Sequence, residues 1–179
     1  MRTFILCLLL LPVAAFARDW NVDMAKSGLG FDGIYQGGAF AGKFAKWTAT
    51  ISYDETDLAH AKFDVTVQLA SVDTGSGERD QTLATSEFFD TAKFPQAHFV
   101  TNAFNRGADG GVIALGTLTI RDQSKPVALK VKFAATGGAT TLDVNTALNR
   151  LDFGLGASGD WADISRDINV HGHLVLTPK

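Results

Sequence analysis

The sequence predicts an all-β protein: an eight-stranded antiparallel up-and-down barrel with one short helical insertion around residues 76–94. Apolar and polar residues alternate in about eight short runs, a pattern typical of strands with one buried face. Turn residues separate consecutive runs, as expected for sequential hairpins. The 18 glycines suit the bends of strongly curved sheets. Sequential hairpins favour a closed barrel, and a two-sheet sandwich is the alternative.

The expected strands follow one another along the chain. They cover residues 29–35, about 40–53, 61–70, 99–105, 112–120, 127–133, 142–148 and 168–176. Alternation is clearest in the third run, whose apolar face holds Phe63, Val65, Val67 and Leu69. In the second run the parity changes between Phe44 and Trp47, which indicates a bulge near residues 45–46. A turn is expected over 122–126, before the sixth run.

A polar stretch, residues 71–95, interrupts the strands. Helix-forming residues fill 78–84 after a Gly-Ser-Gly turn, and Ser76 is a suitable N-cap. Glu78 lies near the positive end of that helix, and Pro95 prevents its continuation. Three apolar side chains are expected to pack this segment on the barrel: Leu83, Phe88 and Phe89.

The N-terminus has the features of a secretory signal peptide. Arg2 precedes an apolar run over residues 4–16, and Ala15-Phe16-Ala17 is a cleavage signal of the A-x-A type. The run is too short to span a bilayer. We therefore expect cleavage after Ala17, export to the periplasm, and a single barrel domain over residues 18–179.

The mature chain carries no cysteine, because Cys7 lies inside the leader. It therefore has no disulfide and no thiolate ligand, and its stability must come from its core. Without Arg2 the chain has 15 basic and 19 acidic residues. This mildly acidic balance argues against nucleic acid as a partner and against strong electrostatic attachment to anionic lipid.

The sequence contains no complete catalytic, cofactor-binding or metal-binding motif. Residues 28–33 match G-x-G-x-x-G, but strand and turn residues follow where a dinucleotide site needs a helix. His171 and His173 share one face of the last strand, yet a metal site needs a third ligand. No G-x-S-x-G motif is present. We expect neither an enzyme nor a bound cofactor or metal.

Three segments together carry a specific pattern. They are Ser71-Val72-Asp73-Thr74-Gly75 with Glu78-Arg79-Asp80, Leu83, Phe88-Phe89-Asp90 and Phe94-Pro95; Gly116-Thr117-Leu118-Thr119-Ile120 through Lys125-Pro126-Val127; and Asn149-Arg150 with Asp152-Phe153-Gly154. In this order they resemble the signatures of the YceI-like family, from Phe44 to the C-terminus. The sequence departs from the family's pattern at Arg121-Asp122 and Leu151, which concerns local turns and not the fold.

The resemblance implies a lipocalin-like barrel in the periplasm. It also implies a long apolar ligand in the interior, such as a polyisoprenoid, an isoprenoid quinone or a fatty-acid amide. Partners are then this lipid and, transiently, a membrane, with the protein a monomer or a homodimer. Two other functions stay open: an accessory to quinone or redox metabolism, and a ligand-free structural or stress-response protein.

The candidate ligand-binding residues are the inward-facing side chains of the expected strands and the aromatic residues near them. They are Phe31, Phe44, Trp47, Phe63, Val65, Val67, Leu69, Phe88, Phe99, Leu118, Ile120, Leu129, Val131, Phe133 and Phe153. For each of them plain core packing is the alternative. Four charged residues are candidates for head-group contact or for bracing the rim: Arg79, Asp80, Arg150 and Asp152.

Overall fold

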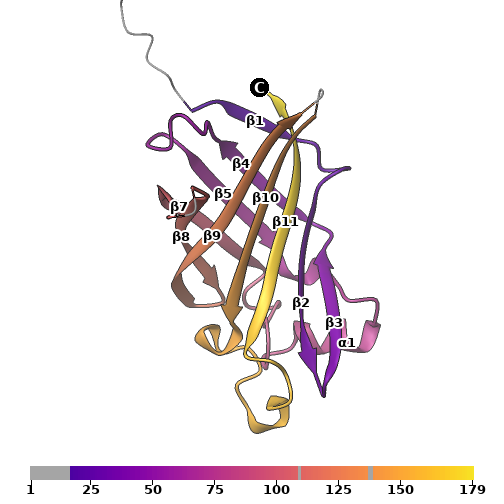
Figure 1. Ribbon diagram of the computed structural model, residues 1–179. Coiled ribbons are helices and arrows are strands. Elements are labelled where there is room, and N and C mark those ends of the chain that lie inside the picture. The colour runs from indigo at the N-terminus through magenta and orange to yellow at the C-terminus, as the bar shows by residue number, and fades with distance from the viewer. Residues whose placement is uncertain (1–16, 109, 137–138) are drawn as a thin grey trace, which may run out of the picture.

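A computed structural model describes residues 17–108, 110–136 and 139–179 (Figure 1). The expected leader lies outside them, apart from Ala17. Within the described ranges the strands are β1 (Asp19–Val22), β2 (Gly28–Tyr35), β3 (Gly38–Phe44), β4 (Trp47–Ser52), β5 (Lys62–Gln68), β6 (Val72–Asp73), β7 (Gln96–Arg106), β8 (Val112–Ile120), β9 (Gln123–Thr136), β10 (Ala139–Asn149) and β11 (Asp167–Pro178). The helical elements are α1 (Gly77–Ala84) and the 3-10 turns η1 (Leu69–Ser71), η2 (Arg150–Phe153) and η3 (Gly159–Trp161). None of these helices is long and apolar enough to cross a membrane.

These strands form eight chain segments, because three segments are each divided in two. β1 and β2 are the two halves of the first segment, and both pair with β11. β3 and β4 are the two halves of the second segment: β1 pairs with β4, and β2 pairs with β3. β5 and β6 form the third divided segment and pair with β4 and β3. From there the order β5-β7-β8-β9-β10-β11 follows the chain. Antiparallel pairing of β11 with β1 and β2 closes the barrel, which confirms the predicted fold.

The second segment is interrupted where the alternation fails. The second segment is broken at Ala45–Lys46, between β3 and β4, as the change of parity predicted. Ser76 caps α1 by accepting a hydrogen bond from the Arg79 backbone N–H at 3.4 Å, also as predicted. The expected turn over 122–126 is wrong: β9 already begins at Gln123, and the turn is tightened by a left-handed Arg121 (φ 58°).

Pro126 lies inside β9 because the outer edge of that strand is unpaired at this point. β9 pairs with β10 only as far as Lys130, which lies opposite Asn145. Residues 123–129 of β9 pair with β8 alone, so the missing N–H of Pro126 is tolerated. The two strands therefore separate toward the lower end of the barrel in Figure 1.

Aromatic rings fill one end of the interior, which we call the filled end; it carries β1 and the last residues of β11 (Figure 1). Tyr53 lies at the centre of this cluster. Its ring centroid is 5.8 Å from Phe63, 6.0 Å from Phe104 and 5.1 Å from Phe133. Offset and edge-to-face pairs of this kind add to the free energy gained from burial alone.

The Tyr53 hydroxyl has no hydrogen-bond partner among the described residues, although the side chain is buried. We expect Tyr53→Phe to raise the free energy of unfolding by about 1–3 kcal/mol at pH 7, because a buried unpaired hydroxyl is costly. Burial, with a smaller contribution from Glu55, raises the pKa of Tyr53 from 10.0 to about 12. The unfolded chain therefore loses this proton first, and the wild type should lose stability relative to the variant as the pH rises from 10 to 12.

Urea denaturation of both proteins at pH 7 and at alkaline pH checks this expectation. Tyr35→Phe is the matched control, because Tyr35 is 38% exposed. A Tyr53→Phe variant that is less stable than the wild type at pH 7 would contradict the assignment of an unpaired hydroxyl.

Candidate functional site

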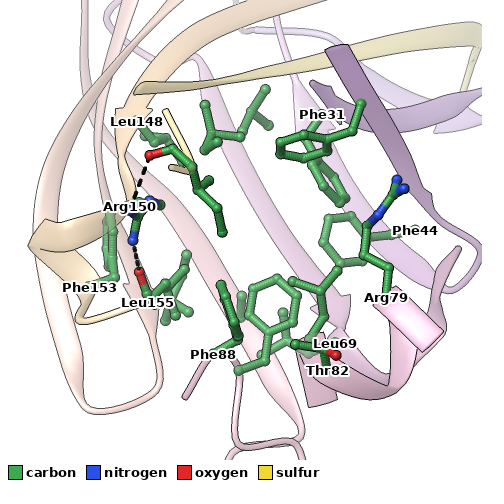
Figure 2. Close-up of a pocket in the computed structure, with 18 of the residues that line it drawn as sticks. Phe31, Phe44, Leu69, Arg79, Thr82, Phe88, Leu148, Arg150, Phe153 and Leu155 are labelled. Atoms are coloured by element: carbon green, nitrogen blue, oxygen red, sulfur yellow. Dashed lines mark hydrogen bonds between the residues drawn. The ribbon is translucent and has the colours of Figure 1, made fainter. Parts of the chain in front are cut away.

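A cavity of about 480 Å³ occupies the other end of the interior, which we call the cavity end. Apolar side chains from β2, β3, β5, β8, β10 and β11 form its wall, and α1 and the β10–β11 loop border it (Figures 1 and 2). Figure 2 shows Phe31, Phe44 and Arg79 on one side of the space and Leu148, Arg150 and Phe153 on the other. The site is thus a hollow in the barrel core.

Small residues on two neighbouring strands make this space. A Cβ on Gly42 would lie 2.4 Å from Cζ of Phe31, so that ring lies directly over the β3 backbone. A Cβ on Gly33 would lie 2.7 Å from Cδ1 of Ile168 and 2.8 Å from Cζ of Phe40. Because glycine lets these side chains lie close to the wall, the centre of the barrel stays open.

The cavity ends at a layer of side chains that we call the floor: Leu29, Phe44 and Val67. All three line the cavity and also pack against the aromatic core of the filled end. Val67 lies opposite Trp47, whose side chain belongs to that core and is 7% exposed. Beyond the floor, the interior is packed with side chains.

Four polar side chains of the site lie at the rim, on and near α1. Ser76, Glu78, Arg79 and Thr82 face the cavity from this helix and its cap. The Arg79 guanidinium lies 5.8 Å from the centre of the Phe40 ring, in a cation–π arrangement. Asp80 holds the helix in place by accepting hydrogen bonds from Thr74 N–H (2.9 Å) and Thr74 Oγ1 (2.7 Å).

Arg150 is a buried cation in the cavity wall and is 6% exposed. Its side chain donates five hydrogen bonds, all to backbone carbonyls: Ser165 (3.1 Å), Leu155 (2.7 Å), Gly156, Trp161 (2.8 Å) and Ile164 (3.2 Å). Burial, and to a lesser degree the charge of Arg166, lowers the pKa of Arg150. A guanidinium remains charged in proteins all the same. Every N–H is used, so Arg150 holds the β10–β11 loop and has no donor left for a ligand.

A second arginine joins that loop to the segment after α1. Arg121 Nη1 donates to the carbonyls of Phe88 (3.2 Å) and Gly154 (3.4 Å). The Phe88 ring also meets Trp161 edge-on, with centroids 5.0 Å apart. These contacts fix the lower border of the cavity from both sides.

A smaller space of about 220 Å³ lies where β9 and β10 separate. Leu148 and Phe153 line both this slot and the main cavity, so they form the partition between the two. Asp152, one of the candidate rim residues, borders the slot and is exposed.

The structure brings eight of the fifteen candidate ligand-binding residues to the cavity: Phe31, Phe44, Val67, Leu69, Phe88, Leu118, Ile120 and Phe153. Six others face inward but pack in the filled end: Trp47, Phe63, Val65, Leu129, Val131 and Phe133. Phe99 is buried against Gly116, outside the cavity lining. Of the candidate rim residues, Arg79 and Arg150 line the cavity.

Several lining residues were not among the candidates. Phe40, Leu148, Ile168 and Val170 lie in the expected strands at inward positions, and the alternation alone would have identified them. Trp161 and Ile164 lie in the β10–β11 loop, which has no periodicity to reveal an inward side chain.

The two histidines of the last strand lie on the outer surface of the barrel. His171 Nδ1 is 3.6 Å from Asp32 Oδ1, and His173 Nδ1 is 2.6 Å from Asp143 Oδ1. Within the described ranges no three His, Cys, Asp or Glu side chains are grouped as a metal site would require. The G-x-G-x-x-G stretch lies on β2.

An eight-stranded barrel with an apolar cavity at one end defines a class of small-ligand-binding barrels. The YceI-like domain model matches residues 20–176, and the chain belongs to this family. A UPF0312 protein of Vibrio vulnificus is 27% identical over 96% of both chains. One of Shewanella baltica is 32% identical over 72% of this chain and 69% of its own length.

Solved structures share the fold. The crystal structure of Burkholderia cenocepacia BcnA matches with a TM-score of 0.81 and 28% identity, over 88% of this chain and 100% of that chain. A polyisoprenoid-binding domain from Saccharophagus degradans matches with a TM-score of 0.67 over 92% of this chain and 100% of that chain. At 16% identity, this second likeness concerns the fold alone.

We expect Arg150→Lys to lower the free energy of unfolding by at least about 3 kcal/mol, because a lysine has three donors for five buried carbonyls. Arg166→Lys is the control: Arg166 is an exposed neighbour, and its replacement should change stability by less than about 0.5 kcal/mol. Thermal and urea denaturation measure both. Equal stability of the two variants would show that the carbonyl cage does not depend on the guanidinium.

Proposed function

We propose that the protein holds the hydrocarbon tail of a lipid in the cavity end of its barrel, as a periplasmic carrier or reservoir. The apolar cavity with its polar groups at the α1 rim is the observation that carries this proposal. A tail fits the wall, and a head group fits the rim. A related fold in Saccharophagus degradans is described as a polyisoprenoid-binding domain, which supports the same ligand chemistry here.

A binding role without catalysis agrees best with the chemistry of the wall. A reaction on a bound lipid needs a polar reactive group deep in the cavity. Arg150 lies across the cavity from Arg79 (Figure 2), and its five donors are already engaged by carbonyls. Ser76, Glu78, Arg79 and Thr82 lie at the rim, where they can meet a head group, and Tyr35, which is 38% exposed, also lines the cavity.

Val67→Phe tests whether the cavity holds lipid. The added ring extends from the floor into the cavity, so we expect retained lipid to fall several-fold while the melting temperature stays within a few degrees of the parent. Val65→Phe is the matched control, because Val65 packs in the filled end. There the ring overpacks the core, which should cost about 1–3 kcal/mol of stability and leave lipid retention unchanged.

Lipid is measured by organic-solvent extraction of the purified proteins followed by mass spectrometry. A parent protein that carries no lipid, and takes up none from vesicles, would refute the carrier function and favour a ligand-free structural role. Lipid loss in both variants to the same degree would show that the effect is not local to the cavity.

The proposed function places the protein in the periplasm, so the protein must be exported. If the leader is cleaved after Ala17, the mature chain begins at Arg18. N-terminal sequencing of protein recovered from the periplasm should therefore read Arg-Asp-Trp. An intact Met1 or a lipid-modified Cys7 would contradict this prediction.

A further inference from the structure

The cavity has a definite depth, because the interior beyond its floor is already occupied. Leu29, Phe44 and Val67 end the open space, and behind them Trp47 and the rings around Tyr53 fill the barrel. A tail that enters at the α1 rim therefore stops at the floor and cannot pass through to the filled end. The length of chain that the site accepts is set by its volume.

We infer that the site takes one hydrocarbon chain of about 16 carbons, with the chain end on the floor and the head group at the α1 rim. This inference rests on the proposed function. If a methylene takes the same share of volume as a water molecule in the liquid, about 30 Å³, then about 16 of them fill this space of about 480 Å³, which is open at the rim. The favoured ligands are therefore single-chain amphiphiles, of acyl or short isoprenoid type, and not lipids with two long chains.

The polar rim fixes which end of the ligand is outermost. Arg79 and Glu78 lie side by side on α1 and offer both a donor and an acceptor to a head group. At the opposite limit, the floor side chains are hydrocarbon only. A polar head at the floor would lose its hydrogen bonds to water without replacement, which selects the head-out orientation.

Chains longer than the cavity leave their excess carbons in water. The excess carbons can extend through the rim or, past Leu148 and Phe153, through the slot between β9 and β10. For a lipid drawn from a membrane, each buried methylene is nearly neutral, since one apolar surrounding replaces another. Each methylene left in water, in contrast, lowers retention about fourfold. Retention should thus be flat up to about 16 carbons and then fall steeply.

The test uses the full-length mature protein and vesicles of phosphatidylcholine that contain an equimolar series of straight-chain primary alcohols of 12 to 28 carbons. After incubation the protein is separated from the vesicles, and mass spectrometry gives the retained amount of each alcohol relative to the vesicle. We expect a cut-off near 16–18 carbons. Phosphatidylcholine itself should be retained at least tenfold less than the 16-carbon alcohol.

Two matched variants locate the cut-off at the floor. Val67→Ala removes two methyl groups from the floor and should move the cut-off longer by about two carbons. Val65→Ala makes the same deletion two residues away on the same strand face, inside the filled end, and should leave the cut-off in place. Val67→Phe should move it shorter.

The outcomes separate this inference from the function on which it rests. If the parent retains no alcohol of any length, the proposed function fails, and the length limit with it. If it retains alcohols up to 28 carbons equally, lipid binding stands and the length limit is overturned. A cut-off that moves equally in Val67→Ala and Val65→Ala would overturn the assignment of the floor.

Discussion

A closed barrel has one interior, and in this chain side chains fill it at one end and leave a cavity at the other. At the filled end, rings from β5, β7 and β9 converge on Tyr53 and pack the interior. At the cavity end the rings of Phe31 and Phe40 lie over Gly42 and Gly33, close to the wall. Core and cavity therefore arise from one pattern of inward-facing residues, and the position of the glycines decides where the pattern stays open.

At the cavity end, arginine side chains fix the loops by donating hydrogen bonds to backbone carbonyls. Arg150 gathers five carbonyls of the β10–β11 loop, and Arg121 connects this loop to the segment after α1. For Arg150, whose five donors are all satisfied, loss of these bonds would leave a buried charge unpaired, which is very costly. Asp80 secures the facing border by binding Thr74. The rim thus has a defined shape although the space that it encloses is not filled by protein.

Most of the fold could be predicted from the sequence, because a strand with one buried face alternates with a period of two. The same period cannot report depth along the barrel axis. Val65 and Val67 are equivalent by pattern, yet Val65 packs in the filled end and Val67 lines the cavity. What separates them is the set of side chains that neighbouring strands bring to each level: on β7, Phe99 lies opposite Val65, whereas the small Ala97 lies opposite Val67. The sequence pattern also cannot predict that Trp161 and Ile164 line the cavity, because an irregular loop has no periodicity.

For the proposed lipid carrier, the division of the interior also bears on how lipid would be exchanged with a membrane. A chain of about forty carbons taken wholly from water would nominally gain more free energy than any non-covalent complex achieves, at about 0.8 kcal/mol per methylene. Lipids, however, come from bilayers, where the tail is already in an apolar surrounding. Tail burial then provides capacity but little net affinity, so discrimination must come from the floor and the rim. In the proposed function the floor would penalise excess length, and the opposite charges of Glu78 and Arg79 at the rim would meet the head group. Near-balanced exchange with such local selection suits a carrier, which must release its ligand as readily as it takes it up.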